Sequence, residues 1–198
     1  MLTRQTSLPP FGLPRIWLVS DARNDPVLEA GLHRLPRGSG LIFRHDHLSE
    51  GERRARFDGL RRLCRRLGHA LILSGSPQEA QRWGADGSYG PPCPGRTLIT
   101  VHALKEIARA NRLGAAGVLL SPVYPTRSHP GAKGLGRARF LLLAQRSRSP
   151  VIALGGMTQR RFRGLKVHGW AAIDGLSPSR ARPATAGLGA ATACWMTA

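Results

Sequence analysis

The segment LITVHALKEIARANRLGAAGVLL (98–120) shows most clearly how the chain is organised. An apolar run (98–101) precedes a segment with helical character (103–113), and a second apolar run (117–120) follows it. Strands that are almost wholly apolar and alternate with helices are typical of a parallel sheet whose faces are covered by helices. The segment therefore predicts an α/β protein.

Apolar runs of the same kind recur along the chain, at 16–20, 40–44, 70–73, 87–89, 98–101, 117–120, 151–154 and 170–173. Helical patterns lie between several of them, at 50–67, 77–83, 103–113, 137–146 and 159–167. Eight strands that alternate with helices predict a small (β/α)8 TIM barrel with short helices. An open, doubly wound sheet is the alternative architecture.

The length of 198 residues fits one domain that is large enough to bury its own core. We expect a single barrel domain over 1–198, with a core of about 16–178 and tails at 1–15 and 179–198. The second tail is rich in Gly, Pro and Ala, and it lacks the periodicity of a regular closing helix.

Neither a membrane span nor a secretory signal is evident, because no apolar run approaches roughly 18 residues and the N-terminus has no apolar region. The three cysteines, Cys64, Cys93 and Cys194, are odd in number and have no metal-ligand spacing. We therefore expect a cytoplasmic protein without a membrane partner, a disulfide framework or a zinc site.

The formal net charge of +19 would attract phosphate, whether on a nucleic acid or on a small metabolite. Lysine occurs only at 105, 133 and 166, so arginine supplies nearly all of this charge. The basic residues are dispersed along the chain, and many fall on the presumed outer faces of helices. We therefore do not favour a nucleic-acid partner, although a non-catalytic binder of phosphorylated ligands or nucleic acid remains an alternative function.

Polar residues and glycines gather where the predicted strands end, while the strands themselves are apolar. In chain order these positions are Asp21, Arg44, Ser74 and Gly75, Tyr89 and Gly90, His102, the loop 121–136, Gly155 and Gly156, and 174–177. In a barrel of parallel strands, ligands bind in the loops that follow the strands. This end of the barrel is therefore the predicted active site.

The segments LGGMT (154–158) and DGLSP (174–178) follow the last two predicted strands. Glycine allows a phosphate to approach the backbone, and free N–H groups supply the donors. We predict a phosphate site built from Gly155, Gly156, Leu176 and Ser177. The alternative is that the glycines only form tight turns.

Two further features lie at the same predicted end. The loop SPVYPTRSHPGAKGLG (121–136) offers hydrogen-bonding groups at Thr126, Ser128 and His129, and ordered loops of this length are usually functional. His102 directly follows a strand and could move protons near neutral pH. The alternatives are a surface insertion for the loop and a capping or packing role for His102.

These motifs together resemble the thiamine phosphate synthase and thiazole tautomerase superfamily, over about 16–177 and most closely in VHALKEIARANRLGAAGVLLSPVYPT, SHPG and VIALGGMTQRRFRGLKVHG. The resemblance implies a barrel that binds the phosphate of a hydroxyethylthiazole. It implies that Thr126, Ser128 and His129 surround thiazole phosphate, with Gly156, Leu176 and Ser177 at the phosphate. It also matches Arg44 to an arginine that meets pyrophosphate, and His102 to the acid–base histidine of the tautomerases.

The chain departs from the synthase pattern at several positions. The synthases carry an Asn-Asp pair after the third strand and an Asp after the fourth, whereas this chain has Ser74 and Gly75, and then 89–93 without a carboxylate. Asp46 replaces an expected lysine, and His129 stands where a lysine is usual. Mg²⁺ prefers carboxylate and phosphate oxygens, so these changes remove its usual protein ligands.

The preferred functional prediction is therefore a tautomerase-like proton transfer in thiamine biosynthesis, with His102 and Arg44 as catalytic residues and no metal or other cofactor. The close alternative is thiamine phosphate synthase, which couples the pyrimidine diphosphate to thiazole phosphate and would use Mg²⁺. A small phosphorylated thiazole is the expected partner in either case, and homo-oligomer formation is left open.

Overall fold

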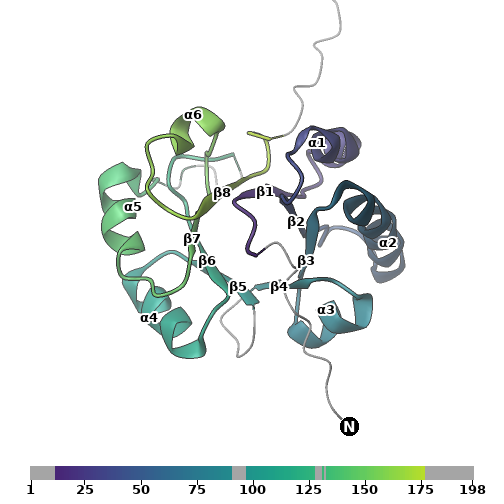
Figure 1. Ribbon diagram of the computed structural model, residues 1–198, viewed down its shortest axis with the longest axis horizontal. Coiled ribbons are helices and arrows are strands. Elements are labelled where there is room, and N and C mark those ends of the chain that lie inside the picture. Colours follow the sequence, from purple (N-terminus) through teal and green to yellow (C-terminus); the bar gives the residue numbers. More distant parts are fainter. Residues whose placement is uncertain (1–11, 91–96, 128–130, 132, 177–198) are drawn as a thin grey trace, which may run out of the picture.

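Eight parallel strands close into a barrel in sequence order, with β8 paired to β1, as the view in Figure 1 shows. The structure is a computed structural model that describes residues 12–90, 97–127, 131 and 133–176. The strands are β1 (Ile16–Val19), β2 (Gly40–Phe43), β3 (Ala70–Ser74), β4 (Gly87–Gly90), β5 (Thr97–Val101), β6 (Gly117–Leu120), β7 (Val151–Ala153) and β8 (Gly169–Ala172). The predicted (β/α)8 barrel is confirmed, and an open sheet is excluded.

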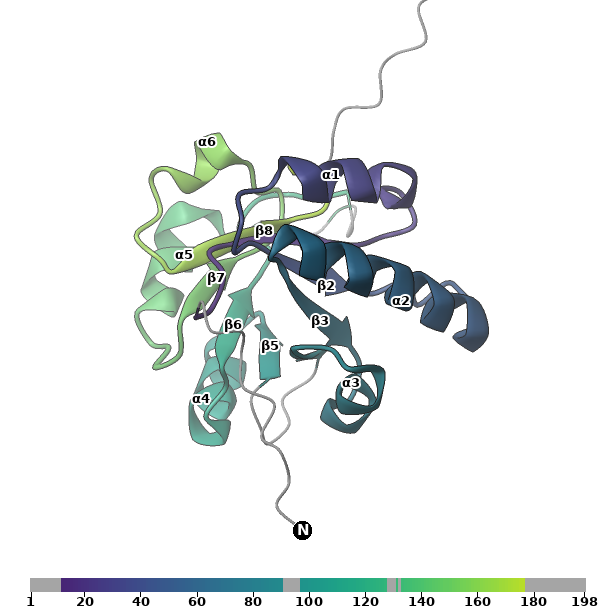
Figure 2. The same cartoon turned by 45° about the vertical axis from the view of Figure 1, so that its right-hand side comes forward.

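The helices surround the barrel on its outside (Figures 1 and 2). They are α1 (Leu28–Arg34), α2 (Glu50–Leu67), α3 (Pro77–Trp83), α4 (Leu104–Leu113), α5 (Gly136–Ala144) and α6 (Gln159–Phe162), and a short 3₁₀ helix, η1 (Asp25–Val27), precedes α1. The longest, α2, begins with a capping box between Ser49 and Glu52 and ends at Gly68, whose φ of 71° suits glycine.

The observed helices differ from the predicted ones in three places, and two of these differences have a simple physical cause. The helix α1 has no counterpart among the predicted ones, because it has only seven residues and its apolar positions include a glycine, Gly31. The last helix is shorter than the predicted 159–167, since α6 ends before Arg163 and Gly164. The helix α5 begins one residue earlier and ends two residues earlier than the predicted 137–146.

The interior of the barrel is filled by side chains from alternate strand positions, as the two-residue period of a strand requires. Trp17, Ile42 and Ile72 belong to this interior cluster, together with Leu98, Leu119 and Ile152 from the other half. A Cβ atom at Gly40 would overlap the indole ring of Trp17, so glycine at this position leaves room for that ring. The barrel is therefore a filled core and not a channel.

The remaining strand residues face outward and form two separate layers beneath the helices. One layer joins β1, β2 and β3 to α1, α2 and α3, and it includes Phe43, Phe57 and Trp83. The other joins β5 to β8 with α4 and α5, and it includes Ile107, Phe140 and Trp170. No helix among the described residues is long and apolar enough to span a membrane.

Candidate active site

The carboxyl ends of all eight strands lie at one end of the barrel, because the strands are parallel. We call this end the mouth. A pocket of about 240 Å³ opens there beside the ends of β1 and β2. Its walls are the residues that follow these two strands: Ser20, Asp21, Ala22, Arg44, His45, Asp46 and His47.

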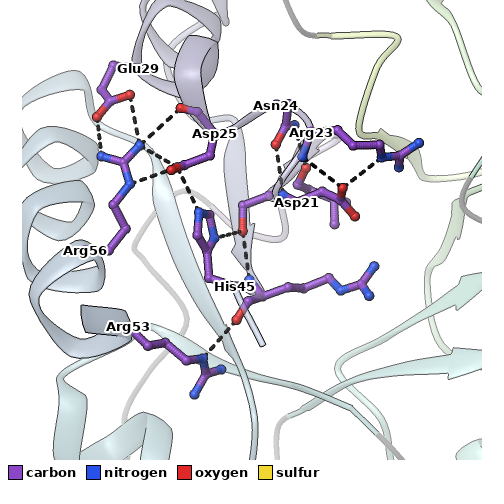
Figure 3. A network of polar contacts seen from close by, with 11 residues as sticks. Asp21, Arg23, Asn24, Asp25, Glu29, His45, Arg53 and Arg56 are labelled. Carbon is purple, nitrogen blue, oxygen red and sulfur yellow. Dashed lines mark hydrogen bonds and ion pairs between the residues drawn. The ribbon is translucent and has the colours of Figure 1, made fainter. Parts of the chain in front are cut away.

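A buried chain of hydrogen bonds fixes the loop after β2 (Figure 3). The backbone N–H of Arg44 donates to Ser20 Oγ at 2.8 Å, and Ser20 Oγ lies 2.8 Å from His45 Nδ1. His45 Nε2 lies 2.8 Å from Asp25 Oδ1. The carboxylate can only accept, so Nε2 carries the proton and the Ser20 hydroxyl donates to Nδ1.

The order serine, histidine, aspartate is that of a hydrolase triad, but the burial excludes that role. Ser20 is 0% exposed and His45 is 1% exposed, so a substrate cannot reach the hydroxyl. His45 also adopts a φ of 48° and stacks on Phe43 with ring centroids 4.6 Å apart. The buried imidazole therefore turns the backbone directly after Arg44 and positions that arginine at the pocket.

Arg56 of α2 binds Asp25, the last residue of this chain of hydrogen bonds. Its Nη2 donates to Asp25 Oδ1 at 2.7 Å, and its guanidinium also binds Glu29. Burial alone would raise the pKa of Asp25, but the hydrogen bonds from His45 and Arg56 hold it below its usual value. Burial lowers the pKa of His45, and the neighbouring Asp25 carboxylate raises it by less. The pKa therefore lies below its usual value, and this favours a neutral ring at neutral pH.

Arg53, also on α2, joins the ends of β2 and β3. Its Nε donates to the carbonyl of Arg44 at 2.9 Å, and its Nη2 donates to the carbonyl of Ser74 at 2.6 Å. Its Nη1 lies 3.1 Å from Glu79 Oε1. A second positive charge is therefore fixed behind Arg44.

Asp21, Arg23 and Asn24 connect the ends of β1 and β8. Asp21 Oδ1 accepts from Arg23 Nε at 2.8 Å, and Arg23 Nη1 lies 3.6 Å from Asp174. The buried Asn24 amide donates to the carbonyl of Val19 at 3.0 Å, and its oxygen accepts from Asp21 N at 2.8 Å. The loop after β8 is thus held against the wall of the pocket.

On the opposite side of the mouth, backbone turns at glycine residues allow the loops to pack against one another. A Cβ at Gly155 would lie 2.7 Å from Pro122, and one at Gly156 would lie 3.0 Å from the Tyr124 side chain. A Cβ at Gly175 would overlap the carbonyl of Met157. The loops after β6, β7 and β8 therefore meet closely enough that each contact requires glycine.

The turn after β7 has a backbone conformation that favours glycine at two successive positions. Gly155 and Gly156 have φ values of 95° and 59°, which glycine adopts readily. Thr158 caps the start of α6 by accepting from Arg161 N at 3.3 Å. The Arg161 guanidinium binds the carbonyl of Gly156 and lies 4.6 Å from the centre of the Tyr124 ring. A positive charge is therefore held beside the glycine turn.

His102 follows β5, next to the end of β6. It is exposed, and its Nδ1 lies 2.8 Å from the carbonyl of Ser121, to which it donates. Within the part of the chain that the structure describes, Nε2 has no hydrogen-bond partner. The imidazole is therefore oriented, and in its neutral form with Nδ1 protonated its Nε2 is a hydrogen-bond acceptor.

The structure brings most of the predicted site residues to the mouth. Arg44, His102, the half-buried Thr126, Gly155 and Gly156 lie on loops at this end, and Leu176 packs under the loops between the two helix layers. Ser128, His129 and Ser177 lie outside the described residues, so their predicted roles stay predictions. Which of these groups contacts a ligand also stays a prediction.

Sequence reasoning missed four residues that organise the mouth: Asp25, His45, Arg53 and Arg161. Asp25 and His45 are 20 residues apart, and Arg53 lies on a helix, so nothing local indicates their contacts. Arg161 could have been found, because a basic residue in the first turn of a helix after Gly-Gly lies near the N–H groups of the predicted phosphate site.

The carboxylates at the mouth do not suit a protein-held Mg²⁺. Asp21, Asp46 and Glu79 each form an ion pair with an arginine. Among the described residues, no group of three or more His, Cys, Asp or Glu side chains could hold a metal ion. The donor set offers guanidinium groups where Mg²⁺ would require oxygens.

Comparisons with known proteins agree with this architecture. The family model described as "Thiamine monophosphate synthase" matches residues 98–176. A "Putative thiamine-phosphate synthase 2" of Aquifex aeolicus (strain VF5) is 26% identical over 83% of this chain and 97% of its own length. A "Thiamine-phosphate synthase" of Azoarcus sp. (strain BH72) is 30% identical over 72% of this chain and 78% of its own length.

A solved structure also shows the same fold. The thiamine phosphate pyrophosphorylase from Pyrococcus furiosus superposes with a TM-score of 0.69 at 22% identity, and the match covers 80% of this chain and 85% of that one. The barrel, the meeting of the three glycine-bearing loops and the sequence relatives lead to one conclusion. The chain belongs to the thiamine monophosphate synthase family.

Proposed function

We propose that the protein is a thiamine phosphate synthase, which joins a pyrimidine diphosphate to thiazole phosphate. In this reaction a bond forms between the two heterocycles while the carbon–oxygen bond to pyrophosphate breaks. Pyrophosphate leaves with the electrons of that bond. The two sequence relatives carry the name of this enzyme, so they favour this alternative over the tautomerase that the sequence motifs first favoured.

One observation carries the proposal: a glycine turn and an arginine pocket lie at the same mouth of the barrel. The Gly155–Gly156 turn and Arg161 offer backbone N–H groups and a positive charge to thiazole phosphate. Arg44, with Arg53 fixed behind it, offers positive charge to the departing pyrophosphate. The reaction needs both kinds of group, because both substrates are anionic.

The assay is thiamine phosphate formation by the purified full chain from the two substrates, with and without added Mg²⁺. We expect product in both conditions, since arginines occupy the region where the protein would otherwise supply metal ligands. No product in either condition would refute the synthase proposal. Product only with Mg²⁺ would refute the idea that arginines suffice, while leaving the synthase proposal intact.

Thiazole tautomerase activity is the second candidate, and the geometry of His102 is the observation that favours it. The bond from Nδ1 to Ser121 leaves Nε2 as a proton acceptor at the mouth. In an isomerisation assay on thiazole carboxylate phosphate, His102→Ala should abolish turnover. His33→Ala is the matched control, because His33 is exposed at the end of α1, away from the mouth. Equal turnover in the two variants would exclude this role.

A cytoplasmic location and homo-oligomer formation remain predictions. Size-exclusion chromatography with light scattering would give the oligomeric state directly.

A further inference from the structure

The charges of the barrel are divided between its two ends. Each helix runs back from the mouth, so the last helical turns and the loops before the strands lie at the opposite end, which we call the amino-terminal face. Nine of the eleven acidic side chains lie at the mouth or in the first turn of a helix: Asp21, Asp25, Glu29, Asp46, Glu50, Glu52, Glu79, Glu106 and Asp174. Of the other two, Asp58 is in the middle of α2, and only Asp86 is on the amino-terminal face.

The amino-terminal face carries exposed basic side chains from nearly every part of the barrel. They are Arg15, Arg34, Arg37, Arg65, Arg66, Arg82, Arg112, Arg146, Arg148, Arg163 and Lys166. These positions are scattered along the sequence, which makes the charge look dispersed. The fold gathers them at one end.

This charge is not neutralised within the chain. Within the part of the chain that the structure describes, no side chain of that set forms an ion pair, whereas arginines at the mouth and on α2 do. All eleven acidic side chains lie in the described part, so the remaining residues add no side-chain carboxylate. Asp86 itself accepts a hydrogen bond from the backbone of Leu71 at 2.8 Å. The amino-terminal face therefore has a strong, uncompensated positive field.

Contacts between neighbouring loops bring several of these cations together. A Cβ at Gly68 would lie 2.9 Å from Arg37 Nε, so Arg37 lies beside the end of α2 that carries Arg65 and Arg66. Arg65 also lines a recess of about 180 Å³ on this face. On the other side, Asn111 binds the carbonyl of Arg146 at 2.9 Å and the N–H of Arg148 at 2.8 Å. These contacts place Arg37 beside Arg65 and Arg66 on one side, and Arg146 beside Arg148 on the other.

The dipoles of the helices explain only part of this pattern. A basic residue in the last turn offsets the partial negative charge at a helix end. Arg15, Arg37, Arg148 and Lys166 lie outside the helices, so this effect does not account for them. The helix ends therefore do not explain why all of these cations lie on one face.

We propose that the amino-terminal face binds the phosphate backbone of double-stranded nucleic acid without sequence preference. Arginine supplies almost all of the charge, and its guanidinium binds phosphate through two hydrogen bonds. Obligate protein interfaces have an apolar core, and amphipathic helices that bind membranes bury an apolar face. Among the described residues the large exposed hydrophobic ones are Leu104, which begins α4 near the mouth, and Leu142, which lies in the last turn of α5 and is the single one of the two at this end. The face therefore suits a polar, strongly charged interface of the kind that nucleic acids form.

The test measures the affinity of the full chain for a fluorescent DNA duplex of mixed sequence as a function of salt. The double variant Arg65→Glu and Arg66→Glu reverses two charges on the face. Arg139→Glu and Arg160→Glu is the matched control, because it changes the net charge equally at exposed positions near the mouth. The double variant Arg65→Gln and Arg66→Gln is a second test, since Glu near the C-terminal end of a helix is itself unfavourable.

We expect the wild type to bind at physiological salt, with equal affinity for unrelated sequences. The double variant at Arg65 and Arg66 should weaken binding by about tenfold. It should also reduce the slope of log affinity against log salt concentration by about 2. The control variant should change both quantities by clearly less. An equal effect of the two pairs would overturn the proposal, because only net charge would then matter. Absence of binding at physiological salt would overturn it too, as would stronger binding to polyglutamate or to anionic vesicles than to the duplex.

Discussion

In the half of the mouth formed by β1 to β3, charged side chains hold the loops in place, whereas in the half formed by β5 to β8 backbone turns do so. Ser20, Asp25, His45, Arg53 and Arg56 form one connected network in the first half. In the second half, Gly155, Gly156 and Gly175 allow three loops to touch. The same division runs through the core, which has a separate layer of buried side chains under the helices of each half.

The family model matches only the second half, at residues 98–176. The first half contains most of the departures from the synthase pattern that the sequence shows, including Asp46, Ser74 and Gly75, whereas His129 is a departure in the second half. A turn with positive φ values constrains the sequence strongly, because few residues other than glycine adopt them. A site made of charged side chains can be rebuilt with other residues. The comparison thus predicts different responses to substitution in the two halves.

Replacement of Arg44 should have the largest effect on activity. Arg44→Gln removes the charge that faces the pocket, and we expect kcat/KM to fall by about 10²–10³-fold, because such groups stabilise charge in the transition state. Arg62→Gln is the control, since Arg62 is exposed and lies away from the mouth on α2. Steady-state kinetics for thiamine phosphate formation provide the measurement. Similar kinetics for both variants would show that Arg44 does not take part in the reaction.

Gly155→Ala should destabilise the half of the mouth formed by β5 to β8. The methyl group would meet Pro122 at a φ of 95°, and we expect a loss of about 3 kcal/mol in the free energy of unfolding together with weaker thiazole phosphate binding. Gly114→Ala, at a φ of 63° with nothing within 4 Å, should cost about 1 kcal/mol. Urea unfolding and calorimetric titration test both. Equal losses would mean that the close approach of the loops contributes nothing.

His45→Gln should affect stability in a pH-dependent way. At neutral pH we expect a loss of about 1–3 kcal/mol, because Ser20 and Asp25 lose buried hydrogen bonds. The pKa of folded His45 lies below 6.5, so the unfolded chain binds the extra proton first as the pH falls through that value. Wild-type stability should therefore decline in acid, and the gap between wild type and variant should narrow.

Thermal melts from neutral to mildly acidic pH would measure this gap. The charged or titratable neighbours of His45 are Asp25, His47 and Arg56, and they are present in both proteins. The buried His69, whose pKa burial also lowers, is likewise unchanged. A gap that stays constant across this range would show that His45 does not titrate differently in the folded chain.

Tyr89→Phe removes a contact between the two halves of the mouth, and among these variants it should change stability and activity the least. The Thr100 hydroxyl donates to the Tyr89 oxygen at 2.7 Å, and this bond joins β4 to β5 inside the mouth. Its loss should cost about 1 kcal/mol of stability, with little change in kcat/KM. A large change in activity instead would indicate that the phenol contacts substrate.

The sequence predicts the barrel well because its strands are short, apolar and separated by helices, and each of the eight predicted runs overlaps an observed strand. It also predicts Arg44, His102 and the Gly155–Gly156 turn at the mouth, since strand ends determine their positions. It does not reveal the network around His45. Ser20 is 25 residues from His45, and Arg56 reaches Asp25 from a different helix, so only the folded chain brings them together.

Inside the barrel, the ring of Trp17 occupies the space that a side chain at position 40 would need, and its Nε1 donates to the carbonyl of Pro14 at 2.8 Å. The two positions therefore cannot evolve independently. A relative with alanine or a larger residue at the equivalent of Gly40 should carry a smaller residue in place of the indole. In a mutational scan, Gly40→Ala should be tolerated only after Trp17 has been replaced, so the order of the two substitutions decides which evolutionary paths are open.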